Sequence, residues 1–165
     1  MKLGLLIFNI VSSQLLNTVR LPIRPIYISK QIEQAHTDAI HWAMSEYNRY
    51  ATLWDGNMFF EVQDKNINHI RIQYEEYNGC SMSAVSMSEG YFLVSETVIC
   101  FQRELDPIMT QCVILHELGH ALGLGHTDNA TTSIMHQILP LQSYDACTLK
   151  KRDLINLFDI FNNGY

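Results

Sequence analysis

Residues 116–126 hold the side chains of this sequence that are best suited to bind a metal ion. His116 and His120 are four residues apart, so on a helix their imidazoles project from one face and can hold a single cation. Glu117, beside the first histidine, can reach a water molecule on that cation. The segment reads His-Glu-Leu-Gly-His-Ala-Leu-Gly-Leu-Gly-His, so every fixed position of the long H-E-x-x-H-x-x-G-x-x-H pattern is filled. We therefore predict that His116, His120 and His126 bind one zinc ion and leave its fourth position to water.

A helix must position these side chains, and the sequence marks both of its ends. Asp106 followed by Pro107 is a strong start signal, because aspartate caps the free N–H groups and proline fits the first turn. Apolar residues then occur on nearly every side, which predicts a central, buried helix. Gly119 permits close packing, and Gly123 is placed to end the helix in a left-handed conformation and so bring His126 to the metal. The alternative, histidines that are ordinary polar residues of a core, leaves the required offsets of the glycine and the third histidine unexplained.

The composition predicts one globular domain. The chain has 165 residues, of which 47% are hydrophobic and 17% charged, which suits a single core of ordinary size. A formal net charge of -6 offers no basic surface for nucleic acid or an anionic membrane, so neither is an expected partner.

The chain outside the metal-binding segment predicts a mixed sheet with a helix packed on it. Strands are expected at four apolar or alternating runs: Arg24–Ile28, Met58–Val62, His69–Tyr74 and Val98–Phe101. A helix is expected from about Lys30 to Tyr50, with Ser29 as its cap. Its core-facing residues recur at helical spacing: Ile32, Ala35, Ala39, Trp42 and Ala43. We predict an α+β fold.

Cysteines and the remaining histidines show no second site. The four cysteines lack the paired short spacings of a zinc ribbon or redox site, and they are too sparse for a disulfide scaffold. We interpret Cys112 as a core residue and Cys80 as a buried or edge-strand cysteine. Three histidines without ligand spacing are interpreted as surface or strand residues: His36, His41 and His69.

Residues 1–20 have two interpretations. Met1-Lys2 and the apolar run of residues 3–11 have the outline of a short signal peptide, which would imply a secreted protein. The other interpretation is an N-terminal extension that forms part of the mature fold. Polar residues interrupt the run, and a membrane-spanning helix needs about 20 apolar residues, so no membrane anchor is expected. Residues 21–165 form the single predicted domain.

The zinc-binding segment resembles that of the metzincin zinc peptidases and is most similar to the matrixin, or matrix metalloproteinase-like, form. Residues 121–124, Ala-Leu-Gly-Leu, match the matrixin pattern between the second and third ligands. The resemblance implies the metzincin fold, with a twisted mixed β-sheet, an active-site helix, a methionine turn and a C-terminal helix. Met135 is expected in that turn as a hydrophobic floor beneath the metal, and residues 153–161 resemble the last matrixin helix, whose aspartate packs it behind the turn. The similarity covers about residues 24–161.

The resemblance implies a zinc-dependent endopeptidase that acts on a protein or peptide, as a monomer. Zinc would activate water, and Glu117 would serve first as base and then as acid. Residues 80–86 are expected to be the sheet edge that pairs with an extended peptide; the alternative is an ordinary surface loop. No cysteine-bearing inhibitory segment precedes Leu21, so we expect control in trans. Two alternatives remain open, a catalytically silent peptide-binding or decoy module of the same fold and a metal hydrolase with another substrate class.

Several positions depart from the matrixin pattern. Thr127 follows the third histidine where matrixins usually have serine, and His136-Gln137 replaces the Tyr-Pro of the specificity pocket wall. Substrate preference therefore cannot be transferred from matrixins. Gln137 also occupies the place where astacins and serralysins carry a tyrosine that can bind zinc, so no fifth protein ligand is expected. Cys100 and Gln102 replace ligands of the structural zinc and calcium, so only the catalytic ion is expected.

Overall fold

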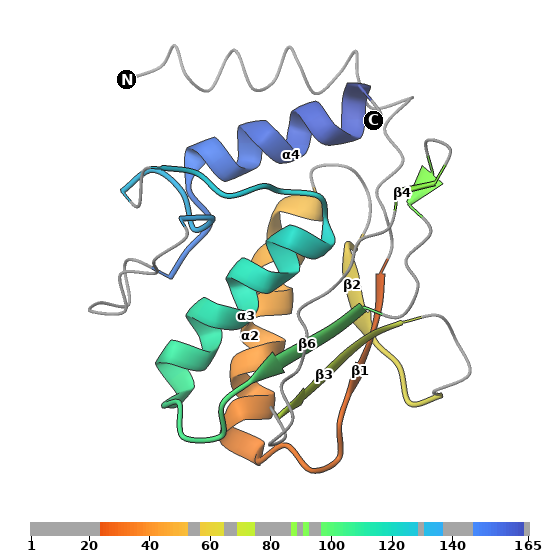
Figure 1. Ribbon diagram of the computed structural model, residues 1–165, viewed down its shortest axis with the longest axis vertical. Coiled ribbons are helices and arrows are strands. Elements are labelled where there is room, and N and C mark those ends of the chain that lie inside the picture. Colours follow the sequence, from red (N-terminus) through yellow and green to blue (C-terminus); the bar gives the residue numbers. More distant parts are fainter. Residues whose placement is uncertain are drawn as a thin grey trace.

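The computed structural model describes residues 24–52, 57–64, 69–74, 87–88, 91–92, 97–128, 131–136 and 147–163. Within these residues a four-stranded sheet carries two helices on one face, as Figure 1 shows. The strands of this sheet are β1 (Arg24–Ile28), β2 (Phe59–Glu61), β3 (Ile70–Tyr74) and β6 (Thr97–Phe101). The helices are α2 (Gln34–Ala51), α3 (Pro107–Ala121) and α4 (Lys151–Asn163), and a short hairpin is formed by β4 (Met87–Ser88) and β5 (Tyr91–Phe92).

The four-stranded sheet has the order β2-β1-β3-β6, and every neighbouring pair is parallel. Ile26 lies beside Ile70, and Ile72 lies beside Ile99, so isoleucines meet across three strands on the face that is buried. The hairpin β4-β5 is antiparallel. All four predicted strands are confirmed, with ends that differ by at most one residue.

The first helix starts later than predicted. Ser29 does not cap it; instead the Ser29 carbonyl accepts a hydrogen bond from the Ile32 N–H at 3.0 Å, and this turn precedes the helix. The N-cap residue is Glu33, whose side chain makes no capping hydrogen bond, and α2 begins at Gln34. The prediction that Ala35 faces the core was also wrong, since Ala35 is exposed. Two of the predicted core residues of this helix, Ala39 and Ala43, are confirmed as buried. The buried stripe is completed by other positions: His36, Ile40, Met44, Glu46, Tyr47 and Ala51.

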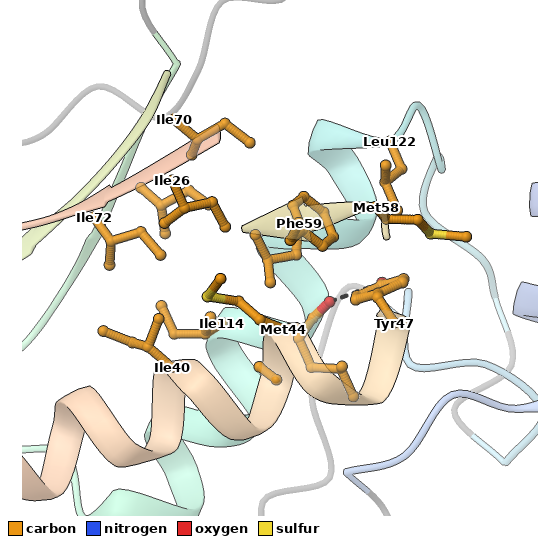
Figure 2. Close-up of a cluster of buried hydrophobic side chains, with 14 of the residues drawn as sticks. Ile26, Ile40, Met44, Tyr47, Met58, Phe59, Ile70, Ile72, Ile114 and Leu122 are labelled. Atoms are coloured by element: carbon orange, nitrogen blue, oxygen red, sulfur yellow. Dashed lines mark hydrogen bonds between the residues drawn. The ribbon is translucent and has the colours of Figure 1, made fainter. Parts of the chain in front are cut away.

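The core lies between the sheet and the two central helices. α2 packs against both β2 and α3, and α3 contacts β6. Figure 2 shows isoleucines of the sheet facing Ile40 and Met44 of α2 and Ile114 of α3. The helix with the metal-binding pattern is therefore held on two sides, by α2 and by the sheet. Among the described residues, no helix is both long and apolar enough to cross a membrane.

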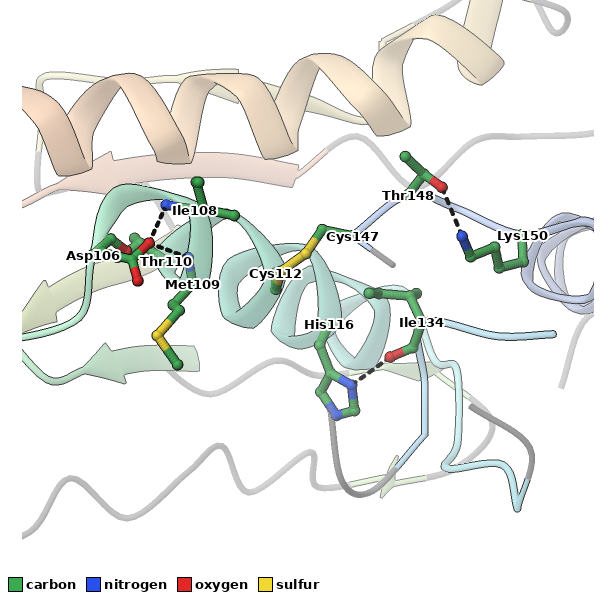
Figure 3. Close-up of a disulfide and its surroundings, with 10 residues drawn as sticks. All are labelled: Asp106, Ile108, Met109, Thr110, Cys112, His116, Ile134, Cys147, Thr148 and Lys150. Carbon is green, nitrogen blue, oxygen red and sulfur yellow. Dashed lines mark hydrogen bonds between the residues drawn. A yellow bond between two sulfur atoms is a disulfide. The ribbon is translucent and has the colours of Figure 1, made fainter. Parts of the chain in front are cut away.

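A disulfide joins α3 to the segment that precedes α4. Cys112 and Cys147 are both 2% exposed and bonded to each other, with their Cα atoms 4.8 Å apart (Figure 3). Cys100 on β6 is also disulfide-bonded. Cys112 is buried as predicted, but the sequence did not predict that it forms a disulfide with Cys147. Their spacing in sequence gave no signal, because the two half-cystines lie 35 residues apart and meet only through tertiary packing.

Candidate metal centre

Both ends of α3 have the local structure that the sequence predicts. Asp106 caps the start, where its Oδ1 accepts hydrogen bonds from the N–H groups of Ile108 at 2.9 Å and Met109 at 3.0 Å (Figure 3). At the other end, Gly123 has a φ of 95°. The Gly123 N–H donates to the His120 carbonyl, and the Leu124 N–H donates to the Gly119 carbonyl, both at 2.9 Å. This pair of bonds is the Schellman closure, which requires a left-handed residue and turns the chain back toward α3.

The reversal brings three histidine rings together. His126 Nε2 lies 3.3 Å from His116 Nε2 and 3.1 Å from His120 Nε2. Within the part of the chain that the structure describes, these three residues form the one group of histidine, cysteine or acidic side chains able to hold a metal ion. Burial decreases along the set, because His116 is buried, His120 is half-buried and His126 is exposed. The group is thus closed on one side and open to solvent on the other.

Backbone carbonyls fix the orientation of two of these rings. His116 Nδ1 donates to the Ile134 carbonyl at 2.8 Å, and His120 Nδ1 donates to the Leu124 carbonyl at 2.8 Å. With the proton on Nδ1, the Nε2 lone pair of each ring points toward the common centre. Such carbonyl contacts to the second nitrogen are typical of histidines that bind metals.

Two of the three nitrogen separations match those of a tetrahedral zinc ion. Zn–N bonds of about 2.0–2.1 Å at tetrahedral angles place the nitrogens roughly 3.3 Å apart, close to the 3.1 and 3.3 Å that separate His126 Nε2 from the other two rings. The ligand atoms of all three residues lie within 4.8 Å of one another. The pKa of His116 is lowered to about 4, mainly by burial and also by the two neighbouring imidazoles, which together outweigh the raising effects of its hydrogen bond to Ile134 and of Asp153. His116 is therefore neutral at pH 7, which is the form that binds a metal.

Glu117 is the acidic residue of the same turn. It is half-buried. Burial raises the pKa of its carboxyl group, while the charge of His120 acts in the opposite direction. A carboxylate with a raised pKa is a better proton acceptor than an exposed one, which is the property that a general base requires.

Met135 lies directly against α3. It is 1% exposed, and its carbonyl accepts a hydrogen bond from the Thr127 N–H at 2.9 Å. A Cβ atom added at Gly119 would collide with the Met135 thioether. The glycine between the two helical histidines is therefore required by this contact.

A buried carboxylate holds the turn that contains Met135. Asp153 of α4 is fully buried and accepts hydrogen bonds from the Ser133 hydroxyl, from the Ile134 N–H at 3.0 Å and from the Lys150 N–H at 2.8 Å. The Ser133 oxygen in turn accepts from the Met135 N–H at 2.9 Å. The helix that was expected to pack behind the methionine turn does so through this aspartate.

The remaining residues named from the sequence do not lie at the metal-binding group or are not described by the structure. His36 was interpreted as a surface or strand residue, but it is 5% exposed, with Nδ1 2.8 Å from the Tyr74 hydroxyl and Nε2 2.7 Å from the Leu105 carbonyl. Its place on the core side of α2 gave no local signal. Residues 80–86 and Gln137, expected at the substrate groove and pocket wall, lie outside the described residues. The oriented carbonyls of Leu124 and Ile134 are site features that sequence reasoning missed, since main-chain groups carry no residue-type signal.

Comparison with known proteins agrees with this geometry. The Matrixin family model matches residues 26–162, so the chain belongs to the matrixin family of metzincin zinc peptidases. No curated protein sequence matches it. Among solved structures, it is similar to high choriolytic enzyme 1, a hatching enzyme zinc-protease from the medaka fish Oryzias latipes. That similarity has a TM-score of 0.57 at 16% identity and covers 88% of this chain and 91% of the other, which shows a shared fold.

Proposed function

We propose that this protein is a zinc endopeptidase with one catalytic ion bound by His116, His120 and His126. The observation that carries the proposal is the convergence of the three Nε2 atoms, two of them oriented by carbonyl groups. A zinc ion bound there supplies an acidified water molecule and polarises the substrate carbonyl.

Glu117 moves the protons in the proposed reaction. Its carboxylate accepts a proton from the attacking water, which its raised pKa favours. The protonated carboxyl group then donates to the leaving amine, so one side chain serves as base and as acid. Asp153 holds the turn whose Ile134 carbonyl orients His116.

The test is cleavage of a quenched-peptide library by the purified protein, with zinc content measured in parallel. We expect cleavage that stops with a chelator and returns with zinc. Glu117→Gln keeps the size of the side chain but cannot accept the proton, so kcat should fall about 10²-fold or more while one zinc remains bound. His126→Ala should lose the zinc, and His41→Ala, which changes an exposed histidine outside the group, should keep both zinc and activity. Unchanged turnover in Glu117→Gln would overturn the mechanism.

A silent zinc-binding module of the same fold is the competing function. It predicts bound zinc without cleavage of any peptide, and Glu117→Gln would then have no effect on binding of a peptide. Cleavage by the unaltered protein eliminates this alternative.

We also propose that the protein works in an oxidising compartment, as a secreted protein. The Cys112–Cys147 bond and the disulfide at Cys100 support this, because stable disulfides are rare in the cytosol. Fractionation of cells that express the full chain, with thiol labelling of each fraction, tests it. Recovery of active protein with free thiols from the cytosol would contradict it.

A further inference from the structure

Tyr47 of α2 contacts α3 at the turn that carries the metal-binding group. Tyr47 is completely buried, and its hydroxyl donates a hydrogen bond of 2.9 Å to the Leu115 carbonyl, dashed in Figure 2. Leu115 immediately precedes His116, although the two bonded residues are 68 positions apart in sequence. No local pattern connects α2 to the site; the contact exists because the two helices pack side by side.

The hydroxyl group itself needs an explanation. The Tyr47 ring packs edge to face on Phe59, with ring centroids 5.5 Å apart, and a phenylalanine could make the same contact. A buried hydroxyl has a desolvation cost that a phenylalanine avoids, so the hydrogen bond is what the tyrosine adds. In α3 the Leu115 carbonyl also faces the N–H of Gly119, its helical partner. The Tyr47 hydroxyl is thus a second donor to that carbonyl, and it links α2 to one particular turn of α3.

Two groups reach the same point of that turn from different parts of the chain. A Cβ atom added at Gly119 would lie 2.8 Å from the Tyr47 hydroxyl oxygen and closer still to the Met135 sulfur. Gly119 lies between His116 and His120. The hydroxyl and the thioether therefore both lie close to the backbone that sets the separation of these two histidines. Met135 belongs to the methionine turn, whereas Tyr47 belongs to the helix that packs on the sheet.

We propose that Tyr47 is a positioning residue for the zinc site, whose hydroxyl holds the 115–119 turn so that the Nε2 atoms of His116 and His120 face one ion. This inference rests on the proposed function, since it assigns Tyr47 a role toward the same zinc. Tyr47 is completely buried and bonded to the Leu115 carbonyl, so in this role it acts through the backbone of α3.

The experiment compares zinc affinity in Tyr47→Phe and Tyr50→Phe, with the full chain in both cases. Tyr50 is a matched control on the same helix, because its hydroxyl lies 2.9 Å from the Arg49 side chain on the exposed side. We expect Tyr47→Phe to remain folded and to bind zinc about tenfold more weakly, at the lower end of the range for outer groups that orient metal ligands. Its cobalt-substituted form should show an altered visible spectrum, and Tyr50→Phe should match the unaltered protein in both measurements. Unaltered zinc affinity and spectrum in Tyr47→Phe would overturn the inference, even if its stability falls.

Gly119→Ala provides a second test, in which its effect on zinc affinity is compared with and without the Tyr47 hydroxyl. The added methyl group must displace Met135 or the Tyr47 hydroxyl, so zinc affinity should fall. In the double variant with Tyr47→Phe the loss should be smaller than the product of the two single losses, because one of the displaced groups is absent. Independent, multiplicative losses would count against a shared contact point. Zinc affinity is measured without a peptide, so the two proposals can fail separately. If the unaltered protein cleaves nothing, the proposed function is refuted. If Tyr47→Phe nevertheless binds zinc more weakly, this inference still holds.

Discussion

The Ile134 carbonyl accepts a hydrogen bond of 2.8 Å from Nδ1 of His116, so the turn that ends in Met135 also orients a histidine of the metal-binding group. Asp153 holds the same peptide segment, because its carboxylate accepts a hydrogen bond of 3.0 Å from the Ile134 N–H. One short segment therefore connects a buried carboxylate of α4 to an imidazole of α3. The predictions below concern the groups that hold this arrangement.

Asp153→Asn should destabilise both the fold and the zinc site. Both carboxylate oxygens accept hydrogen bonds from buried donors, and an amide would place an NH₂ group against one of them. We expect the free energy of unfolding to fall by about 3 kcal/mol, measured in urea, together with weaker zinc binding. Asp159→Asn, on an exposed position of the same helix, is the control and should change stability by less than about 0.5 kcal/mol. Equal effects in the two variants would show that the Asp153 contacts contribute nothing.

Gly123→Ala should cost about 1–2 kcal/mol of stability, because an L side chain at a φ of 95° is strained. The strain falls on the closure that brings His126 to the other histidines, so zinc affinity should fall as well. Gly125→Ala is the matched control two residues on, where an added Cβ has no atom within 4 Å. Chemical denaturation of the two variants, with and without zinc, measures the difference. A Gly123→Ala protein as stable as Gly125→Ala would contradict the role of the left-handed closure.

Removal of the Cys112–Cys147 bond should lower the free energy of unfolding by about 2–4 kcal/mol, the range for a loop of this size. Cys112→Ala combined with Cys147→Ala tests this bond while leaving Cys100 intact. Thermal unfolding of the double variant with and without a reductant separates its effect from that of the Cys100 disulfide. A double variant as stable as the unaltered protein would mean that packing alone holds α3 to the segment before α4.

High pH should destabilise the unaltered protein more than Tyr47→Phe. Burial, together with the nearby carboxylates of Asp153 and Glu46, raises the pKa of Tyr47 well above its ordinary value of 10.0. Above pH 10 the unfolded chain releases this proton and the folded protein keeps it, so this contribution to stability is complete below pH 10 and is lost as the pH rises. Because of Tyr47, the free energy of unfolding should fall by up to about 1.4 kcal/mol per pH unit in this range. Urea unfolding between about pH 9 and 11 measures it, with Tyr50→Phe expected to follow the unaltered protein. Parallel curves for all three proteins would contradict this prediction.

The sequence alone determined the features that depend on neighbours within a few turns of chain. Asp106 as a cap, Gly123 as a left-handed stop and the four strands were all predicted, because caps, turns and periodicity act over short stretches. The meeting of His116, His120 and His126 belongs to the same class, since a helix and one reversal suffice to bring them together within eleven residues.

Tertiary structure alone decided the strand order, the partner of Cys112 and the contacts behind the zinc site. The Tyr47 hydroxyl is hydrogen-bonded to Leu115, which is 68 residues away in sequence, and Asp153 is hydrogen-bonded to Ser133, which is 20 residues away. The exposure of Ala35 has the same origin, because the rotation of α2 is set by what it packs against. Residue types and spacing predicted the metal ligands. The groups that orient those ligands depend on how the helices and the sheet pack in space, and no short stretch of sequence encodes that packing.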